Sequence, residues 1–88
     1  MMNKPNEKYN QTTTNERFTA VSNIAENIKD FRLSKGISQK VLADAVGVSQ
    51  KAVDYWERGV NEPKATYILR LANFFDVSCD ELLGRNPF

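Results

Sequence analysis

The chain has 88 residues, of which 41% are hydrophobic and 26% charged, with a formal net charge of +1. This length allows one small domain with a thin core, and no apolar run approaches the roughly 18 residues that cross a bilayer. The chain has no His and one Cys, Cys79, which excludes imidazole catalysis, an internal disulfide and Cys- or His-rich metal sites. We therefore expect no metal, no cofactor, no membrane partner and a reducing, cytoplasmic setting.

The N-terminal residues 1–14 are rich in Asn, Thr, Gln and Lys and carry almost no apolar side chains. Such a composition cannot bury enough surface to offset the entropy of ordering, so we expect a disordered polar tail. The segment also lacks the apolar stretch of a secretory signal.

Apolar residues recur at helical spacing after this tail and predict a first helix. Two starts are open, because Thr13 and Asn23 each precede a Glu by three residues, the form of a capping box, and the signal is stronger at Thr13. We expect a regular helix over about residues 23–34, ended by Gly36, with residues 15–22 as its extension under the earlier start. The apolar stripe consists of Phe18, Val21, Ile24 or Ala25, Ile28 and Phe31.

Four further helices are predicted, each bounded by a capping residue or a glycine. Ser38, Ser49 and Ser78 are the expected N-caps, and Ser78 opens a full capping box with Glu81. No segment alternates with period two over more than a few residues, so no sheet is expected and the fold class is all-α. The expected helices cover residues 39–46, 50–58, about 65–75 and a short last stretch that Gly84 ends.

The stretch over residues 38–59 specifies two helices joined by a tight turn. The small side chain of Ala43 lets the helices approach closely, and Gly47 supplies a left-handed backbone for the turn. Val53 and Trp56, three residues apart, mark the buried face of the second of these helices. Together these features predict a helix-turn-helix.

Residues at fixed spacing extend this pattern over about residues 24–84, or two thirds of the chain. They are Ile37-Ser38-Gln39, Leu42-Ala43, Val46-Gly47-Val48-Ser49, Val53, Trp56-Glu57-Arg58-Gly59, Pro63, Leu71-Ala72 and Val77-Ser78 with Asp80-Glu81-Leu82-Leu83. The set closely resembles the lambda-repressor-like, Cro-like helix-turn-helix family, also called the XRE family. The resemblance implies a compact five-helix bundle that binds DNA, with its third helix in the major groove and its second across the phosphate backbone. Asp76 stands where the family commonly has Gly, although Asp tolerates a left-handed backbone better than most residues.

The outward face of the helix over residues 50–58 carries the side chains expected to contact bases. Gln can bond adenine, Lys can donate to guanine, and Asp can accept from the N4 amino group of cytosine. An acid beside DNA is repelled unless it reads a cytosine, so Asp54 either sets specificity by exclusion or makes no contact. Tyr55 can reach a phosphate or pack on a thymine methyl group, or it can be partly structural. The expected base contacts are Gln50, Lys51, Asp54 and Tyr55.

A second set of residues is expected to contact the phosphate backbone. Gln39 matches the family position whose side chain and backbone N–H meet a phosphate, and a helix N-terminus favours anions. Arg32 and Glu57 match family positions that commonly pair, which implies a structural ion pair between the first and third helices. The expected phosphate contacts are Gln39, Ser49, Lys40, Arg58, Asn61 and Lys64.

These features predict a sequence-specific transcriptional regulator that binds double-stranded DNA, acts as a repressor and pairs as a homodimer on a palindromic operator. The near-neutral charge keeps a second interpretation open, an antitoxin or other protein-interaction module of the same fold with a toxin as its partner. An enzyme is not expected, because no cluster of a base and a nucleophile is visible.

The DNA-binding domain is expected over residues 23–84, followed by a short C-terminal tail over residues 85–88. The last helix with Pro87 and Phe88 is the favoured surface for pairing two copies. The region of Phe18 and Val21 is the second choice, since it can also pack on its own domain.

Overall fold

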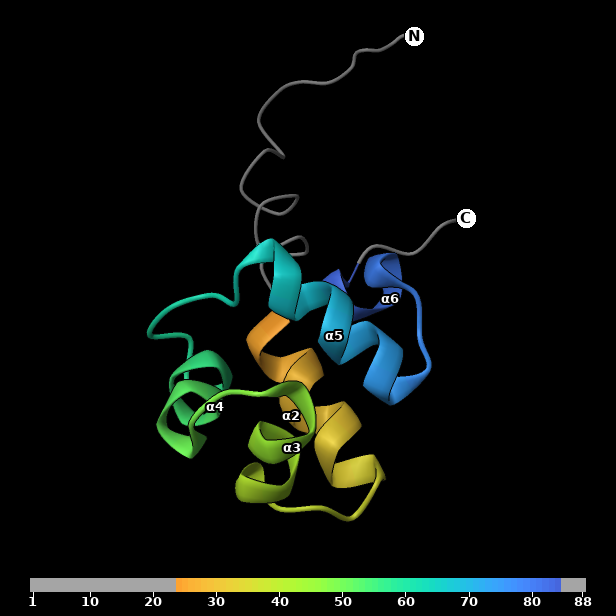
Figure 1. Cartoon of the computed structure of the whole chain (residues 1–88). Coiled ribbons are helices and arrows are strands. Elements are labelled where there is room, and N and C mark those ends of the chain that lie inside the picture. The colour runs from red at the N-terminus through yellow and green to blue at the C-terminus, as the bar shows by residue number, and fades with distance from the viewer. Residues whose placement is uncertain (1–23, 85–88) are drawn as a thin grey trace, which may run out of the picture.

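The computed structural model describes residues 24–84 of the chain. These residues form five α-helices and the turns and loops that connect them. No strand occurs within this range, so the predicted all-α fold of five helices is confirmed. The predictions for residues 1–23 and 85–88, which include both starts of the first helix and the two tails, lie outside the described residues. The helices, labelled as in Figure 1, are α2 (Ile24–Ser34), α3 (Gln39–Val46), α4 (Gln50–Glu57), α5 (Ala65–Phe75) and α6 (Cys79–Leu83).

Three serine hydroxyl groups cap α3, α4 and α6, as predicted. Ser38 Oγ and Ser49 Oγ each accept a hydrogen bond from the backbone N–H three residues further on, both at 3.1 Å. Ser78 forms the full capping box: its Oγ accepts from Glu81 N–H at 2.9 Å, and its own N–H donates to Glu81 Oε1 at 2.8 Å. Each cap is typically worth about 1 kcal/mol, because the first N–H groups of a helix otherwise lack a partner.

Left-handed backbone ends both α3 and α5. Gly47 has φ 83° after α3, and Asp76 has φ 59° and ψ 46° after α5. Asp76 is the one residue other than glycine with positive φ among residues 24–84. Asp76 thus adopts the left-handed backbone that the Gly common at this family position would adopt. The sequence analysis predicted that Asp would tolerate this conformation.

Helix α4 ends at Glu57, one residue earlier than predicted. Arg58 N–H still donates to Asp54 O at 3.0 Å, but the backbone of Arg58, with φ −89° and ψ −2°, no longer continues the helix. Gly59, with φ 74°, then turns the chain away. Helix ends vary by a residue or two, so residue spacing alone does not fix such a boundary.

One apolar core joins the five helices, and α2 runs through its middle (Figure 1). Helix α2 contacts α4, α5 and α6, while α3 packs against α4 and α5. At the edge of the core, the rings of Phe31 and Phe75 pack with their centroids 5.5 Å apart. The largest wholly buried side chains are Ile28, Leu42, Val53, Leu71 and Leu82.

Trp56→Ala is expected to lower the free energy of unfolding by about 3–5 kcal/mol. Trp56 is only 6% exposed, and its ring centroid lies 5.9 Å from that of Tyr67, so truncation removes packing between α4 and α5. Urea denaturation of the full chain measures the change. Leu69→Ala is the control, because Leu69 is 56% exposed and its truncation should cost less than about 0.5 kcal/mol. A Trp56→Ala variant as stable as the parent would contradict this packing.

Candidate nucleic-acid interface

A tight turn after Val46 joins α3 to α4. The N–H groups of Gly47 and Val48 both donate to Ala43 O, at 2.9 and 3.0 Å. Arg70 of α5 holds the turn from the other side, because its Nη1 donates to Val46 O at 3.1 Å. The left-handed backbone favours glycine at position 47, and a Cβ there would lie 3.0 Å from this Nη1, so the Arg70 side chain would have to shift. The turn therefore fixes the direction in which α4 leaves α3.

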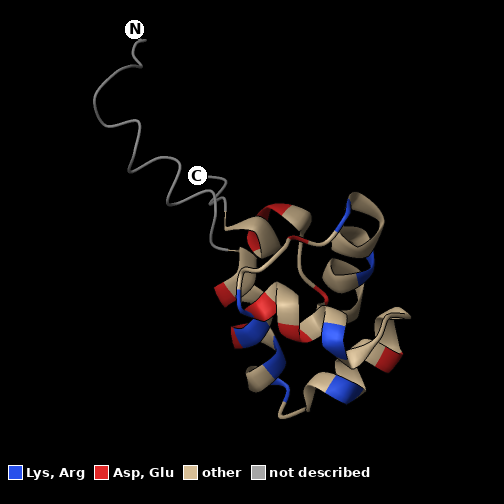
Figure 2. Cartoon of the chain, turned by 90° about the vertical axis from the view of Figure 1, so that its left-hand side faces the viewer, with Lys and Arg blue, Asp and Glu red and all other residues tan. Residues whose placement is uncertain are grey.

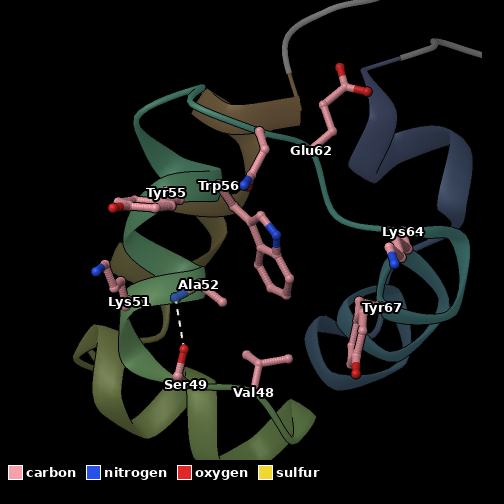
Figure 3. Close-up of a pocket in the computed structure, with 10 residues that line it drawn as sticks. Val48, Ser49, Lys51, Ala52, Tyr55, Trp56, Glu62, Lys64 and Tyr67 are labelled. Atoms are coloured by element: carbon pink, nitrogen blue, oxygen red, sulfur yellow. Dashed lines mark hydrogen bonds between the residues drawn. The ribbon is translucent and has the colours of Figure 1, made fainter.

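Helix α4 buries one face in the core and exposes the opposite one. Val53 and Trp56 are 0% and 6% exposed and anchor the buried face. Lys51 and Tyr55 point to the other side of the helix from Trp56 (Figure 3). The residues predicted to face outward are all partly or fully exposed: Gln50, Lys51, Asp54, Tyr55 and Arg58.

The ring of Tyr55 lies between two cationic side chains of the outward face. Lys51 Nζ is 5.6 Å from the ring centroid, and Arg58 Cζ is 5.4 Å from it. Cation–π contacts of this exposed kind contribute about 0.5–1 kcal/mol each. Tyr55 thus orients two of the predicted DNA contacts, which gives it a structural role whether or not it touches DNA.

A buried ion pair ties α2 to the end of α4. Arg32 Nε and Nη2 donate to the two carboxylate oxygens of Glu57, at 2.6 and 3.0 Å, and Arg32 Nη1 donates to Ile37 O at 2.8 Å. The two side chains are only 11% and 3% exposed. The hydrogen bond to Glu57 and the charge of Glu57 raise the pKa of Arg32, although burial opposes them. With Glu57 ionised, the contribution of Arg32 is therefore present below the ordinary pKa of Arg and is lost as pH rises through the raised value.

Gln39 links this ion pair to the outward face of α4. Its Nε2 donates to Glu57 Oε1 at 3.1 Å and to Asp54 Oδ1 at 3.4 Å. The other carboxylate oxygen of Asp54 accepts from Arg58 Nε at 2.9 Å. Sequence spacing could have identified the Asp54–Arg58 pair, which is four residues apart on a helix. It could not identify the bonds of Gln39, because they depend on how α3 packs against α4.

A groove of about 510 Å³ lies between α4 and the segment that leads into α5 (Figure 3). Five residues predicted from sequence to contact bases or phosphates help to line it, namely Ser49, Lys51, Tyr55, Asn61 and Lys64. The other lining residues were not predicted as contacts; they are Val48, Ala52, Trp56, Glu62 and Tyr67.

Two predicted contacts lie apart from both the groove and the hydrogen-bonded link. Gln50 is exposed at the first position of α4. Lys40 is exposed on α3, where its Nζ lies 3.5 Å from Asp44 Oδ2. Figure 2, which looks onto the side where α4 lies in Figure 1, shows Lys and Arg interspersed with Asp and Glu over the described helices.

The described residues contain neither a cluster of metal-ligating side chains nor a helix long and apolar enough to cross a membrane. Within residues 24–84, no group of three or more His, Cys, Asp or Glu side chains could hold a metal ion. The helices of that same range are all too short and too polar to cross a membrane.

The buried face of α4, the glycine turn and the outward polar face define a DNA-binding domain of the helix-turn-helix class. The chain belongs to this family: the family model described as "Helix-turn-helix" matches residues 28–82. The resemblance to lambda-repressor-like domains is thereby confirmed.

Individual proteins of known sequence or structure share this domain. The chain is 36% identical over 59 residues to the uncharacterized HTH-type transcriptional regulator YqaE of Bacillus subtilis, covering 67% of this chain and 51% of that protein. It is 29% identical over 60 residues to the cryptic phage CTXphi transcriptional repressor RstR of Vibrio cholerae, covering 68% and 54%. The chain thus spans about half the length of the curated relatives it matches.

Solved structures match over a larger share of their own length. The P22 c2 repressor, in complex with a synthetic operator, superposes with a TM-score of 0.68 at 35% identity, covering 72% of this chain and 96% of that one. The restriction-modification controller protein C.AhdI of Aeromonas hydrophila gives a TM-score of 0.66 at 30% identity, covering 73% and 97%.

Arg32→Met is expected to lower the free energy of unfolding by about 3–5 kcal/mol, because it leaves the buried carboxylate of Glu57 without its cationic partner. Adding Glu57→Leu should restore most of this loss, since neither charge then remains buried. Lys40→Met is the control, because the Lys40–Asp44 pair is about 70% exposed on both sides and should be worth less than about 0.5 kcal/mol. Chemical denaturation of the four proteins makes the comparison. A double variant no more stable than Arg32→Met would contradict this account.

Proposed function

We propose that the chain is a sequence-specific transcriptional regulator that reads double-stranded DNA with α4. The observation that carries the proposal is the outward face of α4, which presents hydrogen-bonding side chains. The opposite face of the helix is held in the core by Val53 and Trp56. The match to the P22 c2 repressor, a protein solved in complex with an operator, supports this reading. We propose residues 23–84 as the DNA-binding domain and the cytoplasm as its site of action.

Base readout is assigned to the outward face of α4, with Gln50 and Lys51 as its principal readers. Both lie in the first turn of α4, the end of a recognition helix that contacts base edges. A Gln side chain suits adenine and a Lys side chain suits guanine. Asp54 and Tyr55 follow one turn later and complete the set of base contacts.

Phosphate contacts are assigned to the residues that flank this face. Ser49 caps α4, while Asn61 and Lys64 stand across the groove from it. They can follow one strand of the backbone while α4 occupies the major groove. The complete set is Gln39, Lys40, Ser49, Arg58, Asn61 and Lys64.

Pairing of two copies follows from the size of one domain. A single module of this kind buries only about 600–1,000 Å² on DNA, and a net charge of +1 adds little general attraction. A homodimer on a palindromic operator places two α4 helices about 34 Å apart and engages both half-sites. We propose that the chain pairs through α6 and the C-terminal residues, and that it acts as a repressor.

The second candidate function is a protein-interaction module, such as an antitoxin bound to a toxin. The observation that favours it is the balance of charge near α4, where Lys40 and Arg58 are each paired with an Asp. Salt dependence separates the two functions, because only contacts with phosphates release many counterions.

Titration of the full chain with mixed-sequence DNA is expected to give an affinity that falls steeply with salt, with a slope of about −0.9 per phosphate contact in a double-logarithmic plot. Selection from a random DNA pool should then return a palindrome, and sedimentation on that site should give two chains per duplex. Binding that is absent or insensitive to salt would favour the protein-interaction module. One chain per site on saturated palindromic DNA would exclude the homodimer.

Lys51→Ala is expected to weaken binding to the selected site by about 1–3 kcal/mol and to relax the preference at one base pair. Lys64→Ala, at an exposed phosphate contact that is not bonded to Asp54, should instead weaken binding to all DNA sequences by a similar factor, because a phosphate carries no sequence information. Competition titrations with selected and scrambled duplexes measure both variants, and thermal melts show that each is folded. An equal loss on both duplexes for Lys51→Ala would make Lys51 a phosphate contact.

A further inference from the structure

Asp54 is the one acidic side chain on the outward face of α4, and side chains of its own domain hold both of its oxygens. Oδ1 accepts from Gln39 Nε2 at 3.4 Å, and Oδ2 accepts from Arg58 Nε at 2.9 Å. The Asp54 side chain is 36% exposed and that of Arg58 is 58% exposed, so this link lies at the surface and not in the core. The carboxylate of Asp54 can be solvated without these two bonds, whereas the buried carboxylate of Glu57 depends on its hydrogen-bond partners.

The two partners of Asp54 are both proposed phosphate contacts. A carboxylate offers two anionic oxygens to N–H donors much as a phosphate does. The amide of Gln39 has only two N–H donors, and they point at Asp54 and at Glu57. In the DNA-free protein, Asp54 therefore occupies the donors that a phosphate would require.

We propose, as an extension of the DNA-binding function, that Asp54 is a specificity-determining residue. It acts by exchanging Arg58 and Gln39, its partners in the free protein, for a base of the cognate site. On non-cognate DNA, Asp54 keeps Arg58 and Gln39 from the phosphates, because releasing them would leave its carboxylate unpaired beside the polyanion. On the cognate site, the N4 amino group of a cytosine donates a hydrogen bond to the Asp54 carboxylate. Arg58 and Gln39 are then released and bind phosphates of the DNA backbone. Asp54 thereby couples one base contact to two phosphate contacts.

The geometry makes this exchange feasible. Exposed ion pairs four residues apart on a helix are weak and are readily replaced by other partners. Arg58 Cζ also lies 5.4 Å from the centroid of the Tyr55 ring, a contact that does not involve Asp54. The guanidinium can therefore leave the carboxylate and still remain on the outward face of α4.

The test compares Asp54→Asn with Asp30→Asn in the full chain. Asp30 is exposed on α2, so the control removes the same charge outside both α4 and the proposed pairing surface. Asp54→Asn should bind mixed-sequence DNA about tenfold more tightly, with a salt slope steeper by about 0.9, since Arg58 then neutralises one more phosphate. Its preference for the selected site over scrambled DNA should fall about 5- to 150-fold, the range that one good base contact provides. Asp30→Asn should leave the salt slope and the preference for the selected site unchanged.

Arg58→Gln, alone and combined with Asp54→Asn, identifies the cause of any gain. In the Arg58→Gln background, Asp54→Asn should no longer steepen the salt slope and should lose most of its gain on mixed-sequence DNA. A gain that persists there in full would overturn the proposal, because the carboxylate would then act by its own charge. Equal effects of Asp54→Asn and Asp30→Asn, or an unchanged preference of Asp54→Asn for the selected site, would overturn it too. A parent chain that binds no DNA would instead refute the proposed function itself.

Discussion

The buried pair of Arg32 and Glu57 is the interaction on which the DNA-facing surface depends. It joins the last turn of α2 to the last residue of α4, and Gln39 joins the same carboxylate to the start of α3. Three helices therefore meet at one acidic group that is 3% exposed. Apolar contacts at Val53 and Trp56 hold α4 against the core, but they are not directional. The directional bonds of Glu57 add to this packing a defined position for the end of α4 relative to α2 and α3.

Sequence reasoning succeeded where a residue acts on its own neighbours in the chain. The serine caps, the glycine turn and the left-handed Asp76 depend on local backbone chemistry, and all appear in the structure. The outward face of α4 follows from helical period once its buried residues are identified. The end of α4 was placed one residue too late, because a C-cap residue still forms the last helical hydrogen bond.

Among contacts between distant segments, the family resemblance implied the Arg32–Glu57 pair, but the others could not be predicted from the sequence. The bonds of Gln39 require the packing of α3 on α4, and the groove requires the segment after α4 to return beside it. Tyr67 lines this groove from α5 although no local pattern distinguishes it from a core aromatic residue. The family resemblance predicted where Gln39 lies, but not that its donors are already engaged.

The hydrogen bond from Arg70 to the carbonyl of Val46 gives α5 an influence on the helix-turn-helix. Arg70 and Gly47 both lie outside α4, and a Cβ at Gly47 would come within 3.0 Å of Arg70 Nη1. A larger residue at Gly47 must displace Arg70 and strain the turn at once, so the exit angle of α4 would change. In a genetic screen for loss of regulation, alleles at these two positions would therefore resemble alleles of the recognition helix, although neither residue is assigned a contact with the operator.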